Sequence, residues 1–182
     1  SYLYNTMIDF TLRKYRQLLL TLQQQGYQFL TFEQYLTANM GKTISSGDKY
    51  IILRHDVDLK AANSLATAQI EQELGIQASY YFRVVPQSNQ PEIIRAIAHL
   101  GHEIGYHYED MAICQGNHQQ AYEHFLKQLA YFRQFYPVRT ICMHGAPTSQ
   151  LDGRTLWKHM DYREFGIIGE PYFDVDFSQV FY

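Results

Sequence analysis

The stretch LRHDVD at residues 53–58 places an arginine, a histidine and two aspartates directly after a short apolar run. An apolar run of this length is typical of a buried strand in a parallel sheet. Side chains alternate between the faces of a strand, so we expect Asp56 and Asp58 on one face and His55 and Val57 on the other. Two neighbouring carboxylates repel each other, and a bound divalent cation would offset that repulsion.

Strand and helix patterns alternate along the rest of the chain. The predicted strands are residues 50–54, 78–85, 102–107, 138–143 and 164–169. The predicted helices are residues 10–25, 32–36, 60–74, 91–100, 117–135 and 151–160. Such alternation favours an α/β fold with a parallel sheet or barrel, in which functional groups lie at the carboxyl ends of the strands.

Composition narrows the class of protein. The chain has 182 residues, which fits one domain, and a net charge of -3 without a basic stripe, so nucleic acid is not an expected partner. No apolar run reaches the roughly 18 residues of a membrane span. The two cysteines, Cys114 and Cys142, do not form a disulfide framework. We expect a single catalytic domain over residues 1–182, in a native chain that continues beyond its apolar end.

Three predicted strands end in side chains that can bind metals or transfer protons, at residues 55–58, 106–110 and 143–145. His107 and His144 would supply nitrogen ligands beside the two aspartates, and mixed His and Asp ligation with an open position suits catalytic zinc. The alternative is structural. A single histidine at a strand end is more often a hydrogen-bonded core or surface group, and the aspartates could cap the following helix.

These motifs resemble the polysaccharide deacetylase family, also called the NodB-homology or carbohydrate esterase family 4 group. LRHDVD is similar to the first family motif, in the bacterial branch that bears RHDVD, and GHEIGYH at residues 101–107 is similar to the second. CMHGAP at residues 142–147 stands in the place of the third. The resemblance implies a distorted (β/α)-barrel, and the strands recognised here are too few to close one.

The resemblance also implies roles for individual residues. Asp56 corresponds to the catalytic base, and Asp58 and His107 correspond to metal ligands. Most of the family has a second histidine four residues after the first, where this chain has Met111, a weak ligand for zinc.

The candidates for the third metal ligand are therefore Asp110, Glu109 and His144, and Asp110 is the one we predict. His144 is the candidate general acid if it is not a ligand. Arg54 is expected to orient Asp56 or to form a plain ion pair with it.

The function implied is a hydrolase that depends on zinc or another divalent transition metal and removes an N-acyl group, such as acetyl, from a sugar of a bacterial surface polysaccharide or its precursor. The resemblance places such a protein in the cytoplasm or at a membrane, and leaves its oligomeric state open. Three alternatives remain. The domain could be a degenerate, non-catalytic carbohydrate-binding member of the same fold, a hydrolase of another amide, or an iron oxygenase with two histidines and one carboxylate.

Overall fold

Residues 2–39, 47–145 and 151–178 are described by a computed structural model of the chain. Two parts of the sequence patterns lie outside these residues: Ala146 and Pro147 of the third motif, and the end of the chain from Gln179. Within the described ranges, no helix is both long enough and apolar enough to cross a lipid bilayer.

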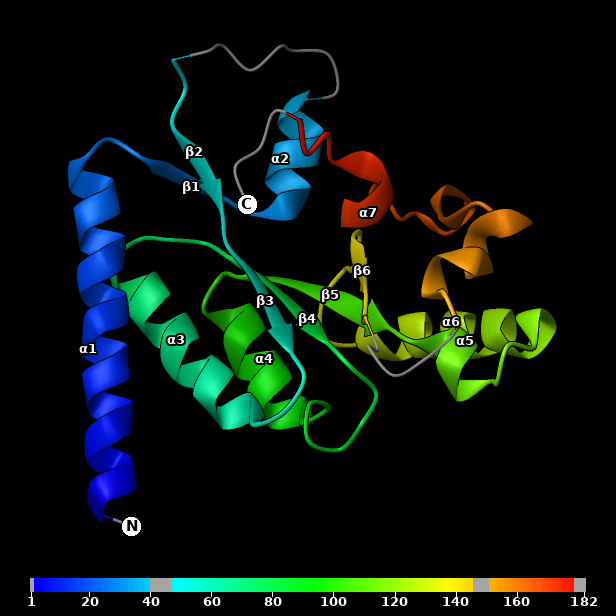
Figure 1. Cartoon of the computed structure of the whole chain (residues 1–182), viewed down its shortest axis with the longest axis horizontal. Helices are drawn as coiled ribbons and strands as arrows, with labels where there is room; N and C mark the ends of the chain where they lie inside the picture. The colour runs from blue at the N-terminus through cyan, green and yellow to red at the C-terminus, as the bar shows by residue number, and fades with distance from the viewer. Residues whose placement is uncertain (1, 40–46, 146–150, 179–182) are drawn as a thin grey trace.

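The strands form two parallel sheets (Figure 1). A small sheet pairs β1 (Gln28–Leu30) with β2 (Tyr50–Ile52), and a larger one has the order β3-β4-β5-β6. Its members are β3 (Arg54–Val57), β4 (Ser79–Phe82), β5 (Glu103–Tyr108) and β6 (Ile141–Met143). This larger sheet is curled like half of a barrel, so the chain has a mixed α/β fold.

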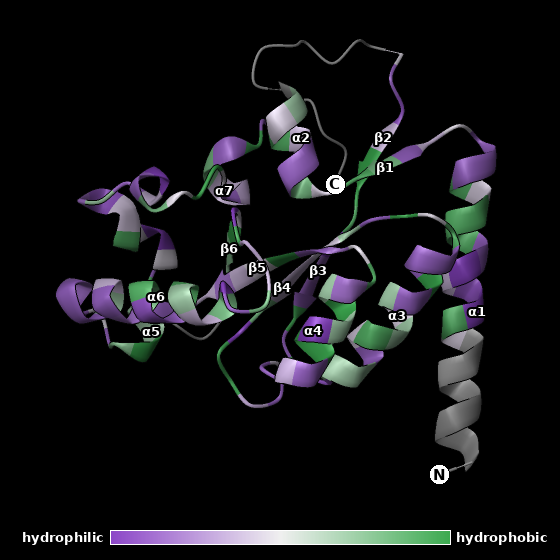
Figure 2. Ribbon diagram, turned by 180° about the vertical axis from the view of Figure 1, so that it is seen from behind, coloured by the Kyte–Doolittle hydropathy of each residue, from purple (hydrophilic) through white to green (hydrophobic). Residues whose placement is uncertain are grey.

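Helices precede, connect and follow the parallel strands, and the sequence predicted all of them except the short helices Asp110–Ile113 and Pro171–Asp174. The helices are α1 (Tyr2–Gln24), α2 (Phe32–Asn39), α3 (Ala61–Glu73), α4 (Pro91–His99), α5 (Asp110–Ile113), α6 (His118–Phe132) and α7 (Pro171–Asp174). Pro91 begins α4 where its missing N–H is not needed, and the Asn117 side chain accepts a hydrogen bond from the N–H of Gln120 to cap α6. Figure 2 shows hydrophobic and hydrophilic bands alternating along α4, as expected for a helix that covers one side of a sheet.

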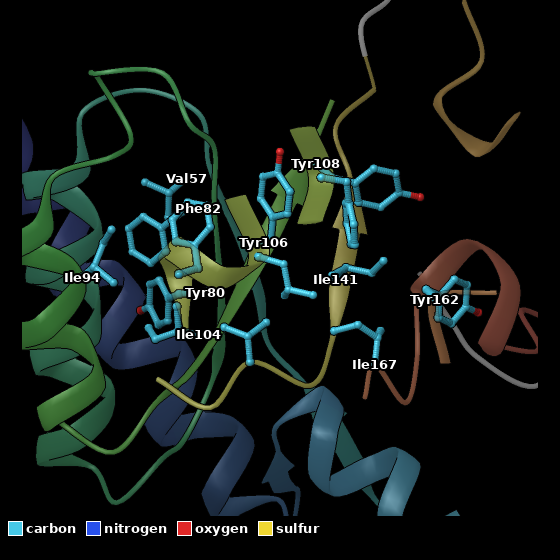
Figure 3. Close-up of a cluster of buried hydrophobic side chains, with 14 of the residues drawn as sticks. Val57, Tyr80, Phe82, Ile94, Ile104, Tyr106, Tyr108, Ile141, Tyr162 and Ile167 are labelled. Atoms are coloured by element: carbon cyan, nitrogen blue, oxygen red, sulfur yellow. The ribbon is translucent and has the colours of Figure 1, made fainter. Parts of the chain in front are cut away.

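One face of the larger sheet carries the main hydrophobic core. Val57, Phe82 and Tyr106 project from three neighbouring strands to the same side (Figure 3), where they meet side chains of α3, α4 and α6. Ile94 and Ile97 of α4 are fully buried there. Burial of each such side chain contributes roughly 1.5–3 kcal/mol, so this face fixes the register of the strands.

The other face of the sheet is polar along much of its length. It carries Asp56, His107 and Cys142, and only a small cluster that includes Phe32 of α2 and Tyr81 closes over part of it. The alternation expected at residues 55–58 is therefore confirmed for the pair His55 and Asp56.

Some expected boundaries are wrong. The predicted strand 50–54 is two strands, because the chain leaves the small sheet at Leu53 and enters β3 at Arg54. Residues 164–169 form no strand. A short 3-10 helix, Tyr162–Phe165, is followed by Gly166 with φ +75°, and Gly169 makes an isolated bridge with Thr140. The predicted helix 151–160 is a shorter 3-10 helix, Gly153–Lys158, and β1 was not predicted.

Candidate metal centre

The charged residues of the sequence motifs meet where β3, β5 and β6 end. Asp56 and Asp58 come from the end of β3, His107 lies near the end of β5, and His144 follows β6. Backbone pairing continues as far as His144, whose N–H donates to the carbonyl of Tyr108 at 2.9 Å. The strands are parallel, so their carboxyl ends lie at one edge and bring these side chains together.

Three side-chain atoms converge at this edge. Asp58 Oδ1 lies 3.4 Å from His107 Nε2 and 3.2 Å from His144 Nδ1. The two histidine nitrogens are 3.2 Å apart. Asp58 Oδ1 is buried and has no hydrogen-bond partner among the described residues, which is costly for a carboxylate oxygen unless a bound group satisfies it.

The protonation of His107 follows from its other nitrogen. Nδ1 lies 2.9 Å from the carbonyl oxygen of Cys142, which can only accept a hydrogen bond, so Nδ1 carries the proton. Burial lowers the pKa of His107, although the nearby Asp56 carboxylate opposes this, and the neutral ring is favoured. Nε2 of that ring presents a lone pair towards Asp58. An acceptor nitrogen and a carboxylate oxygen therefore face each other, as the ligands of a cation do.

The separations suit a tetrahedral transition metal. Ligand atoms about 2.0–2.1 Å from a tetrahedral zinc ion lie roughly 3.3 Å from one another, and the three observed separations are 3.2, 3.2 and 3.4 Å. Two imidazoles and one carboxylate leave a fourth position for water or substrate, as catalytic zinc sites do. Asp58, His107 and His144 therefore fit a divalent metal ion.

Asp56 and Arg54 stand beside this group. Asp56 Oδ2 lies 3.9 Å from His107 Nε2 and 3.1 Å from Arg54 Nη2. The expected ion pair is therefore formed, in a position where Arg54 can hold the orientation of the Asp56 carboxylate.

Asp56, His107 and Cys142 form a second group whose ligand atoms lie within 4.8 Å of one another. Burial raises the pKa of the Cys142 thiol well above its ordinary value, which favours the protonated form that binds metals poorly. The group of Asp58, His107 and His144 is therefore the better metal site.

Asp110, predicted as the third ligand, is not brought to this cluster. Its fully buried carboxylate accepts hydrogen bonds from Tyr106 at 3.0 and 3.1 Å and lies 2.5 Å from His124 Nδ1. Met111 is buried in the hydrophobic core. Asp110 joins α5 to β5 and α6, and its place as the predicted third ligand is taken by His144, one of the alternatives that the sequence left open.

Arg83 belongs to the same edge and was missed in the sequence. It follows β4 and makes two hydrogen bonds to Glu109, with Nε at 2.6 Å and Nη2 at 3.0 Å from the carboxylate oxygens. Its position could have identified it, because the other three strand ends were selected for having charged residues after an apolar strand.

His55 of the LRHDVD stretch points away from this centre. Its Nε2 lies 2.8 Å from Glu71 of α3, and its ring stacks on Tyr80 with centroids 4.5 Å apart. Glu71 is fully buried and also accepts hydrogen bonds from Tyr80 and from Tyr15 of α1. His55 therefore links α1 and α3 to β3, whereas Asp56 and Asp58 face the metal position.

Comparison with known proteins adds no relative. The chain matches no protein-family model, and neither a curated protein nor a solved structure is significantly similar to it. Inference about function therefore starts from the geometry of the centre.

Proposed function

We propose that this protein is a metal-dependent hydrolase that removes an N-acyl group, such as acetyl, from a sugar of a bacterial surface polysaccharide or its precursor. We propose also that its sheet is part of a distorted barrel of the polysaccharide deacetylase type. The observation that supports the proposal most is the buried Asp58 Oδ1, which has no hydrogen-bond partner among the described residues and lies between His107 Nε2 and His144 Nδ1. The carboxylate of Asp56, paired with Arg54, lies beside them. A carboxylate next to a metal position is the arrangement that hydrolysis of an amide by water requires.

Each residue has a role in this proposal. Asp58, His107 and His144 would hold zinc or another divalent transition metal, which when bound activates water and polarises an amide carbonyl. Asp56 accepts the proton of the attacking water, and Arg54 keeps the Asp56 carboxylate aimed at it. The amide C–N bond then breaks, the acyl group leaves as a carboxylate, and the sugar nitrogen leaves as an amine after taking up a proton.

The experiment is an acetate-release assay on N-acetylated oligosaccharides, with the zinc-loaded parent and the Asp56→Asn variant. We expect release by the parent and a loss of at least about 100-fold in the variant, because a general base contributes roughly 10²–10⁴-fold to such reactions. Zinc binding by Asp56→Asn is expected to persist, since Asp58 and the two histidines are intact.

Two outcomes would contradict the proposal. If the zinc-loaded parent releases no acyl group from any N-acylated sugar but binds oligosaccharides, the domain is a non-catalytic carbohydrate-binding member. If it hydrolyses only other amides, the sugar substrate is wrong and the hydrolase chemistry stands.

A further inference from the structure

An ion pair lies behind the metal position, on the far side of His144. Glu109 follows β5, and its carboxylate is clamped by two hydrogen bonds from Arg83 at 2.6 and 3.0 Å. The side chains are mostly buried, with 11% of Glu109 and 18% of Arg83 exposed. The hydrogen bonds to Glu109 raise the pKa of Arg83. A bidentate ion pair of this kind fixes the carboxylate of Glu109 in one orientation.

Arg83 is itself anchored by the backbone. Its N–H donates to the hydroxyl of Ser88 at 2.9 Å, and Ser88 is fully buried. The arginine therefore approaches Glu109 from a fixed point at the end of β4, so the clamp has little freedom to follow His144 if that ring turns.

The clamped carboxylate faces one nitrogen of His144. Glu109 Oε2 lies 3.8 Å from His144 Nε2, on the opposite side of the ring from Asp58. The backbone of His144 is already held by its hydrogen bond to Tyr108, so ring orientation and tautomer are what its surroundings still have to set. Without a metal ion, Asp58 Oδ1 and His107 Nε2 are the nearer acceptors, each 3.2 Å from Nδ1. With the lone pair of Nδ1 given to a metal ion, the ring proton would be on Nε2, and the clamped carboxylate of Glu109 is the group that faces it.

We propose that Arg83 and Glu109 form a positioning pair that holds the ring of His144 in the orientation and tautomer of its metal-bound form. The carbonyl of Cys142 does the same for His107, through the opposite ring nitrogen. This inference rests on the metal site of the proposed function. Loss of a purely structural ion pair between the ends of β4 and β5 would change the stability of the fold but not the affinity for zinc.

The test compares the parent with Glu109→Gln, which keeps the shape of the side chain and removes its charge. Side-chain NMR of the zinc-loaded protein reports the Nε2–H proton of His144. We expect a downfield, slowly exchanging Nε2–H signal in the parent, and an upfield shift with faster exchange in the variant. Zinc titration of the two proteins is expected to show an affinity about 10–100-fold lower in the variant, the usual effect of losing a partner behind a metal ligand.

Two further variants separate positioning from loss of charge or of stability. Arg83→Lys keeps the charge but lacks the planar fork, so it is expected to release Glu109 and weaken zinc binding less than Glu109→Gln does. Glu33→Gln is the control: Glu33 pairs with Arg139 at 2.9 Å, away from the centre, and this substitution is expected to change neither readout.

A parent-like Nε2–H signal of His144 in Glu109→Gln, or parent-like zinc affinity, overturns the positioning role. A parent that binds no zinc overturns the metal site and the positioning role with it, whereas a parent that binds zinc but releases no acyl group overturns only the proposed function.

Discussion

Neighbouring residues of the LRHDVD stretch have different tasks, because they face opposite sides of one strand. His55 contacts Glu71 and stacks on Tyr80, whereas Asp56 pairs with Arg54 and faces His107. Glu71 is fully buried, and its hydrogen bonds with His55, Tyr80 and Tyr15 lower its pKa, although burial itself raises it. The ionised form of Glu71 is therefore favoured only while these partners remain in place.

At this scale we predict that His55→Ala destabilises the protein without affecting the metal site. Loss of a partner to a buried carboxylate costs about 2 kcal/mol in the free energy of unfolding. Urea unfolding of metal-free protein measures this loss, and zinc titration is expected to give the parent affinity. Asp58→Ala is the matched substitution and should show the reverse pattern. A large loss of zinc affinity in His55→Ala would show that this histidine serves the centre after all.

Among the elements, β5 lies at the middle of the structure, with every residue buried. At Gly105 the ring of Tyr81, from β4, lies against the backbone of β5. A Cβ added there would lie 2.3 Å from Tyr81 Cε1 and 2.8 Å from the carbonyl oxygen of Thr140. Packing therefore requires a glycine at position 105 of the GHEIGYH motif. This close packing allows β5 to place His107 near the end of β3.

We predict that Gly105→Ala reduces the free energy of unfolding by about 2 kcal/mol, because the neighbours of the new methyl group must move. Thermal or urea unfolding measures the change. Gly47→Ala is the control, since a Cβ at Gly47 meets no atom within 4 Å. Equal stabilities of the two variants would mean that Tyr81 rearranges freely and that β5 is less tightly packed than described.

Much of the fold was predictable from patterns within single elements. Aromatic and β-branched residues predicted β4, alternation predicted that His55 and Asp56 face opposite sides of β3, and Pro91 marked the start of α4. Residues 164–169 were misassigned because apolar alternation also occurs where side chains reach the core from a turn, as Ile167 does.

The third ligand could not be read from the sequence. Asp110 and His144 both follow strands, and only the three-dimensional arrangement shows that Tyr106 and His124 bind Asp110 away from the centre.

For the molecule as a whole, the polar face of the sheet has two distinct ends. The metal position lies at the carboxyl ends of the strands, and Glu103 lies at the beginning of β5. Its carboxylate accepts hydrogen bonds from Ser79 at 2.5 Å, Thr140 at 3.2 Å and the N–H of Glu33 in the first turn of α2 at 3.3 Å. Glu103 therefore joins the helix to the sheet.

Glu103 should also make stability depend on pH. Burial raises its pKa from the ordinary 4.5 to about 7, and the nearby Glu33 adds to the effect. The folded state thus binds a proton more tightly than the unfolded state, so this contribution to stability is complete below pH 4.5 and is lost as pH rises through about 7.

We predict that Glu103→Gln removes this dependence. Relative to the variant, the parent should lose on the order of 3 kcal/mol of unfolding free energy across that window. Urea unfolding at a series of pH values measures the difference between the two proteins. Parallel stability curves would contradict a raised pKa for Glu103.

The measurement that tests the central claim most directly is the zinc stoichiometry and affinity of the parent, His144→Ala and Asp110→Ala, each checked for folding. We predict one zinc ion per chain in the parent, loss of that ion in His144→Ala, and retention in Asp110→Ala, because Asp110 is bound by Tyr106 and His124 away from the centre. Loss of zinc in Asp110→Ala with retention in His144→Ala, or a parent that binds none, would contradict the account.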